Sequence, residues 1–111
     1  MNIYALSSGP GISGIAVIRI SGNETSGILE KLTGKKTPKP RVATLRKINK
    51  INTSELIDEG IILWFPGPES YTGEDMAEIQ VHGSNAVVDA LHASISGIEN
   101  CRLAEIGRAH V

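Results

Sequence analysis

The chain has 111 residues, of which 41% are hydrophobic, and this is enough for one compact domain with a single core. Eleven basic residues nearly balance twelve acidic ones, so the net charge of −1 gives no electrostatic reason to expect direct nucleic-acid binding. Most of the basic residues fall between Lys31 and Lys50 without aromatic side chains among them, which favours a solvated face over a nucleic-acid-binding surface.

The first half of the chain predicts two strands followed by a helix. Apolar runs over residues 3–6 and 15–20 are typical of strands, and the second run is β-branched and almost continuous. Residues 21–23 then supply a helix N-cap, the helix covers residues 24–33, and Gly34 ends it.

A basic, proline-containing connector over residues 35–40 leads into a second group of strands. A strand over 42–48 and a turn over 49–54 precede an apolar strand over 57–65, which the polar residues and glycine at 58–60 interrupt near its start.

The next strand, Met76–His82, has two chemically different faces. Strict alternation separates an apolar face from a face with a carboxylate, an amide and an imidazole, which is either solvated or the wall of a binding site. The apolar face carries Ala77, Ile79 and Val81, and the other carries Met76, Glu78, Gln80 and His82.

The last elements are a helix and a short strand. The helix begins at a cap within residues 83–85, presents an apolar stripe and ends near Gly97, and an edge strand follows over 101–104. The resulting order, β-β-α-β-β-β-α-β, predicts an α+β domain in which two helices pack on a mixed β-sheet.

Several familiar motifs are absent or incomplete. Residues 9–14 fit G-x-G-x-x-G, but a strand follows where a dinucleotide site needs a helix N-terminus, so we interpret them as a glycine-rich turn. No P-loop occurs, and the single Cys101 excludes an internal disulfide. The histidines lack zinc-ligand spacing, and neither a signal peptide nor a membrane span of about 18 apolar residues is present. These observations predict a soluble cytoplasmic protein without a metal site.

Arg19 and Glu78 are the polar residues that stand out inside strands. A charge buried in a strand is costly unless it is paired, so the two can be surface residues, can pair with each other, or can belong to a small-molecule site. A carboxylate in a partly dry pocket suits a heterocycle with adjacent N–H donors, because both oxygens can accept at once.

The same residues carry a family resemblance that extends from residue 2 to about residue 105. Separate blocks in the right order resemble the start of tRNA modification GTPases of the MnmE (TrmE) family. These blocks are Ile3–Gly11, Gly14–Gly22, Pro38–Arg41, Asp58–Gly60, Leu63–Pro68, Ser70–Asp75 and Glu78–Gly83.

The resemblance implies a fold similar to the tetrahydrofolate-binding domain of the glycine-cleavage T-protein type. It implies that the domain binds 5-formyl-tetrahydrofolate or a related one-carbon tetrahydrofolate through Arg19 and Glu78, forms a homodimer and needs no catalytic residue. Gln80 and His82 would support Glu78, and a lysine that completes the site would lie beyond Val111. In the whole protein, GTP, magnesium and potassium bind a separate GTPase domain, and the FAD-dependent partner MnmG joins in modifying the wobble uridine of tRNA at carbon 5.

Two departures from the family pattern affect, respectively, the contacts of the first loop with ligand or partner and the predicted boundaries. The first loop reads Gly11-Ile-Ser-Gly14 where the family usually has Gly-Arg-Gly-Gly, and Ile106–Val111 replaces a Pro-Gly-Glu-Phe segment. The last six residues can be translated from a common sequencing-adapter oligonucleotide. We therefore expect a folate-binding and dimerisation domain over residues 1–105 of a truncated fragment, and a non-native tail over 106–111.

Two other functions are consistent with the sequence. The domain can be an interaction or dimerisation module that binds no ligand, or a stand-alone folate-dependent transferase domain. Folate binding that depends on Glu78 would favour the folate-binding domain over the interaction module.

Overall fold

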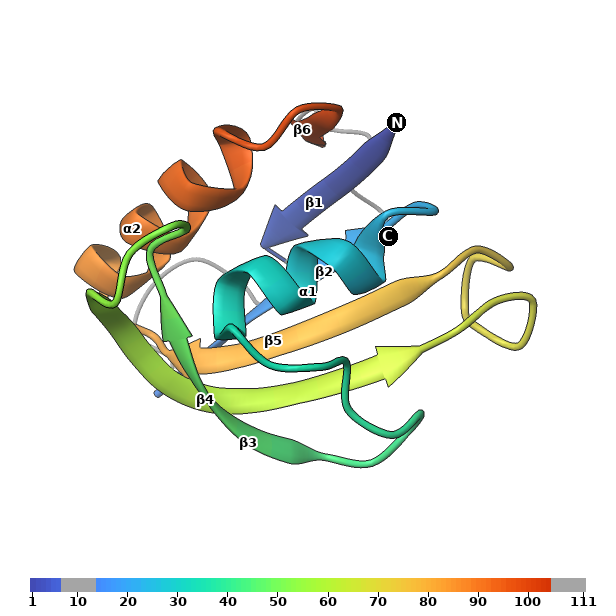
Figure 1. The fold of residues 1–111 in the computed structure, drawn as a ribbon, viewed down its shortest axis with the longest axis horizontal. Coiled ribbons are helices and arrows are strands. Elements are labelled where there is room, and N and C mark those ends of the chain that lie inside the picture. The colour runs from blue at the N-terminus through green and yellow to red at the C-terminus, as the bar shows by residue number, and fades with distance from the viewer. Residues whose placement is uncertain (7–13, 105–111) are drawn as a thin grey trace.

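A single mixed sheet with two helices organises the described part of the chain, which comprises residues 1–6 and 14–104 of a computed structural model (Figure 1). The strand order is β3-β4-β5-β2-β1-β6, and all neighbours are antiparallel except β1 and β6, which are parallel. The α+β class predicted from the sequence is confirmed. The elements are β1 (Asn2–Leu6), β2 (Ile15–Ser21), α1 (Thr25–Thr33), β3 (Thr44–Asn49), β4 (Leu56–Phe65), β5 (Met76–His82), α2 (Asn85–Ser96) and β6 (Cys101–Leu103).

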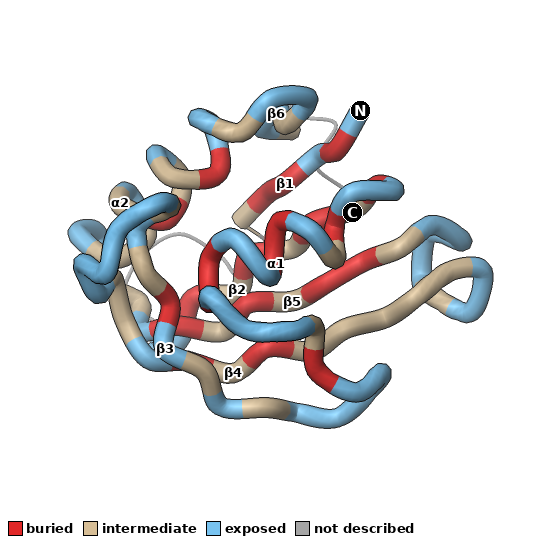
Figure 2. The backbone as a smooth tube through the Cα atoms, in the orientation of Figure 1, coloured by how far each residue is buried: buried red, intermediate tan, exposed pale blue. Residues whose placement is uncertain are grey.

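The core lies between the two helices and one face of the sheet. Buried positions alternate along β2 and β5, because side chains of a strand point to opposite faces in turn (Figure 2). The apolar sides of α1 and α2 cover one of these faces, and the other face is open in the described chain. The largest fully buried apolar side chains are Ile18, Ile20, Ile28, Leu29, Leu32, Ile48, Ile62, Ile79, Leu91 and Ile95.

The start of α1 differs from the prediction. The helix begins at Thr25, its N-cap position is Glu24, and no side chain of the predicted cap segment at 21–23 satisfies its first turn. Instead Asn2 of β1 reaches across: its Oδ1 accepts from Glu24 N at 3.0 Å, and its Nδ2 donates to Glu24 Oε1 at 2.9 Å. A residue more than twenty positions away anchors the helix, and local sequence cannot reveal such a contact.

The predicted interruption of β4 at residues 58–60 was wrong. The strand is continuous from Leu56 to Phe65, and its polar start pairs with β3. Gly60 allows the close approach of β5, since a Cβ atom there would lie 2.2 Å from the carbonyl oxygen of Gln80. The glycine is therefore required by strand packing.

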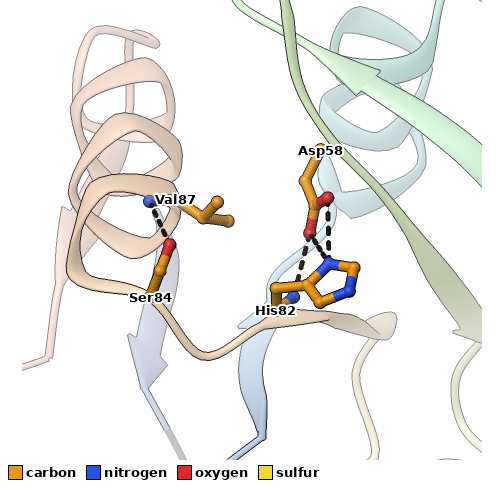
Figure 3. A network of polar contacts seen from close by, with 4 residues as sticks. All are labelled: Asp58, His82, Ser84 and Val87. Carbon is orange, nitrogen blue, oxygen red and sulfur yellow. Dashed lines mark hydrogen bonds and ion pairs between the residues drawn. The ribbon is translucent and has the colours of Figure 1, made fainter.

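Both helix ends and the α2 cap follow the predictions. Gly34 closes α1 with a left-handed conformation at φ 69°, and Ser84 Oγ caps α2 by accepting from Val87 N at 3.2 Å (Figure 3). Neither helix is long and apolar enough to cross a membrane. The glycine-rich turn at 9–14 falls almost entirely outside the described residues, as do the proposed tail at 106–111 and its boundary.

Candidate functional site

Arg19 and Glu78 lie opposite each other on the open face of the sheet. The antiparallel register of β2 and β5 pairs these two residues directly. Arg19 Nε donates to Glu78 Oε2 at 3.0 Å, and Arg19 Nη2 lies 3.0 Å from the same oxygen as an ion pair. The side chains are 33% and 18% exposed, so the ion pair is partly shielded from water. The structure thus brings together the two residues that the sequence singled out.

The ion pair forms one wall of a pocket of about 290 Å³. Phe65, from the end of β4, and Met76, from the start of β5, lie opposite each other in the strand register and line it. Tyr71 contributes from the loop that joins these strands. Sequence reasoning missed all three as site residues. Alternation does place Met76 on the face of Glu78, and the hairpin then brings Phe65 beside it, but no periodic pattern locates Tyr71.

The loop over residues 66–75 is tied down at its base and to β2. Gly67 N donates to Asp75 Oδ1 at 2.9 Å, and a Cβ atom on Gly67 would lie 2.7 Å from the Gly73 carbonyl oxygen. Ser21 follows Arg19 by two residues on β2, and its Oγ lies 3.1 Å from Thr72 Oγ1 in the loop. These contacts hold the loop beside the ion pair.

Gln80 contacts Glu78, whereas His82 belongs to a different network. Gln80 Nε2 lies 3.4 Å from Glu78 Oε1, which is long for a hydrogen bond. His82 instead packs against Asp58, whose carboxylate is 2.9 Å from His82 Nδ1 and accepts from His82 N at 2.9 Å (Figure 3). Asp58 lies outside the lining of the ion-pair pocket, and its pairing with His82 was not predicted from the sequence.

The environment of Asp58 changes its pKa. Burial alone would raise this pKa, but hydrogen bonds from the backbone and ring of His82 and from the backbone of Glu59 together lower it. The carboxylate is therefore a charged partner for the exposed His82 imidazole, and the pair ties β4 to the end of β5.

Two further titratable groups lie away from the pocket. Burial lowers the pKa of His92, against a smaller opposing effect of Asp89, and the ring packs edge-on to Tyr4 at 5.5 Å between centroids. Burial raises the pKa of the Cys101 thiol, which favours the unreactive protonated form. Among the described residues, no group of three or more His, Cys, Asp or Glu side chains could hold a metal ion.

Comparison with known families finds one whose matched range includes the residues of this pocket. The family described as GTP-binding protein TrmE N-terminus matches residues 2–108. The chain belongs to this family. The TrmE N-terminal match covers both strands of the ion pair and the loop that carries Tyr71.

Three relatives of this TrmE N-terminal chain, two from bacteria and one from a fungus, illustrate the similarity. A tRNA modification GTPase MnmE of Pelagibacter ubique is 73% identical over 107 residues, which are 96% of this chain and 24% of that protein. The MnmE of Sinorhizobium medicae is 50% identical, over 95% of this chain and 23% of its own length. A mitochondrial tRNA modification GTPase, mss1, of Schizosaccharomyces pombe is 48% identical, over 95% of this chain and 21% of its own length. The chain thus spans about a quarter of the length of these curated relatives.

Proposed function

We propose that this chain is the one-carbon-folate-binding N-terminal domain of a tRNA modification GTPase. The observation that carries the proposal is the Arg19–Glu78 ion pair in the wall of a pocket lined by Phe65, Tyr71 and Met76. The resemblance to the MnmE family assigns folate contacts to the same two charged residues.

The chemistry of the pocket fits the pterin ring of a tetrahydrofolate. Such a ring presents a ring N–H beside an exocyclic amine, and a carboxylate can accept from both. Arg19 contacts Glu78 Oε2, whereas the contact of Oε1 with Gln80 is long, so ligand donors can replace Gln80 there. Arg19 then orients the carboxylate while the ring rests against apolar and aromatic side chains.

The size of the pocket also fits part of a folate. Pockets that enclose drug-sized ligands occupy roughly 300–1,000 Å³, and this one measures about 290 Å³. It has room for a bicyclic ring, and the aminobenzoyl-glutamate tail would extend into solvent or toward another part of the whole protein.

The wider setting belongs to the same proposal. Curated relatives named tRNA modification GTPases are about four times as long, which leaves room for a GTPase domain that binds GTP, magnesium and potassium. We propose that the domain also forms the homodimer, and that the whole cytoplasmic protein acts with the FAD-dependent MnmG on the wobble uridine of tRNA.

Calorimetric titration of the chain with 5-formyl-tetrahydrofolate tests the folate proposal. Wild-type protein should bind, and Glu78→Gln should bind about 10- to 100-fold more weakly, because an acceptor oxygen becomes a donor amide. Glu59→Gln is a matched control, since Glu59 is an exposed strand carboxylate that does not line this pocket. Equal affinity of wild type and Glu78→Gln would contradict the proposed role of the carboxylate.

An interaction module is the second candidate, and the open sheet face favours it. Ile15 and Leu45 are 56% and 57% exposed, and both lie near Ile61 at a second hollow of about 200 Å³. Exposed apolar side chains that gather at one place on a surface often mark a protein contact. A folded wild-type chain that self-associates but gives no binding heat with the folate would favour this function.

A further inference from the structure

We propose that Tyr71 is a specificity-determining residue that stacks on the bicyclic ring of the ligand. This inference rests on the proposed folate site and assigns one contact within it. A single exposed aromatic residue is ordinary on a protein surface. Tyr71 differs because three separate features place it at the ion-pair pocket.

The first feature is its exposure at the pocket. Tyr71 is 79% exposed, although it lines the same hollow as Phe65 and Glu78. Its ring therefore has almost no packing partner in the absence of ligand. A flat ligand held by Glu78 would cover it, and burial of a large aromatic surface would stabilise the complex.

The second and third features are the support of the loop and the position of the carboxylate. Side-chain contacts from Ser21 and Asp75 hold the loop on either side of Tyr71, so the exposed ring sits on an anchored segment. Glu78 fixes the hydrogen-bonding edge of a heterocycle, which leaves the face of the heterocycle for an aromatic neighbour. Edge recognition and face recognition together would select a planar ring with adjacent N–H donors.

Ligand affinity provides the first test. Tyr71→Ala should weaken binding of 5-formyl-tetrahydrofolate about tenfold, whereas Tyr71→Phe, which keeps the ring, should stay near the wild-type affinity. A bare pterin should show the same dependence on Tyr71, and p-aminobenzoyl-glutamate should show none. Leu45→Ala is the matched control, because it truncates another exposed apolar side chain away from this pocket.

Chemical protection provides a second, independent test. The chain has two tyrosines, and Tyr4 is only 3% exposed, so N-acetylimidazole should acetylate tyrosine almost exclusively at Tyr71. At a concentration that just saturates wild type, 5-formyl-tetrahydrofolate should slow this acetylation, as mapped by peptide mass spectrometry, and the slowing should be clearly smaller in Glu78→Gln.

The outcomes separate this inference from the proposed function. Unchanged affinity in Tyr71→Ala, together with a loss in Glu78→Gln, would overturn the stacking role and leave the folate site intact. Equal losses in Tyr71→Phe and Tyr71→Ala would assign the effect to the hydroxyl group and would also overturn it. Failure of the wild type to bind would overturn both.

Discussion

At the scale of single residues, Arg19 acts through its geometry. Its Nε and Nη2 both approach one oxygen of Glu78, so the guanidinium fixes the direction of the carboxylate. A lysine would retain the charge but would offer a single ammonium without this planar, two-nitrogen contact.

Arg19→Lys should therefore impair binding more than folding. Because the ion pair is partly exposed, Arg19→Lys should lower the free energy of unfolding by about 1 kcal/mol or less. Affinity for 5-formyl-tetrahydrofolate should fall, since Glu78 is then less well oriented. Thermal unfolding and calorimetric titration of the same preparations would measure the two effects. A large loss of stability with unchanged affinity would assign Arg19 a purely structural role.

The sequence predicts these two residues better than it predicts their surroundings. Because side chains alternate along a strand, the sequence alone assigns each of Arg19 and Glu78 to one face of its strand. The antiparallel register of β2 and β5 then brings the two residues together. Tyr71 lies in a loop, where the direction of a side chain depends on hydrogen bonds such as Gly67 to Asp75. His82 was grouped with Glu78 by alternation, but Asp58 of the neighbouring strand gives it a different partner.

At the scale of elements, α1 depends on a strand residue for its start. Asn2 is 1% exposed, and it contacts the Glu24 backbone, the Glu24 side chain and the Asn100 carbonyl oxygen. It therefore joins the first strand, the first helix and the turn before the last strand. Sequence patterns identify the helix correctly because its apolar spacing is local, but they assign its cap to the wrong segment.

Replacement of Asn2 should destabilise the fold, whereas replacement of the predicted cap residue should not. Asn2→Ala leaves buried polar groups without partners and should lower the free energy of unfolding by about 1–3 kcal/mol. Asn23→Ala is the comparison, and this exposed side chain should contribute less than about 0.5 kcal/mol. Urea unfolding monitored by circular dichroism would measure both. The reverse ranking would restore the cap predicted from the sequence.

At the scale of the whole molecule, two groups make stability depend on pH in the same direction. The pKa of His92 is lowered from 6.5 by burial, and that of Asp58 is lowered from 3.8 by its hydrogen bonds despite burial. In each case the unfolded chain binds a proton more readily than the folded chain. The stabilising contribution of each group is therefore present at pH values above its ordinary pKa and is lost as the pH falls below that value.

The two contributions fall in separate pH ranges. Between pH 7.5 and 5.5 the His92 contribution should dominate, so wild type should lose stability over this interval and His92→Phe should lose less. The variant keeps an aromatic ring against Tyr4, which limits the packing change. Urea unfolding at both pH values would measure the difference. An identical pH dependence in the two proteins would show that His92 does not titrate in the way its burial requires.

The one-sided covering of the sheet has a consequence for how the sequence can change. In β2 the even-numbered residues face the helices and the odd-numbered ones, including Arg19, face outward, and in β5 the parity is reversed. Core positions and positions on the proposed binding face thus alternate residue by residue along the same strands. A substitution can change one set of positions without the other. A one-residue insertion or deletion within β2 or β5 would exchange the two sets, and the core and the proposed binding face would be lost in a single step.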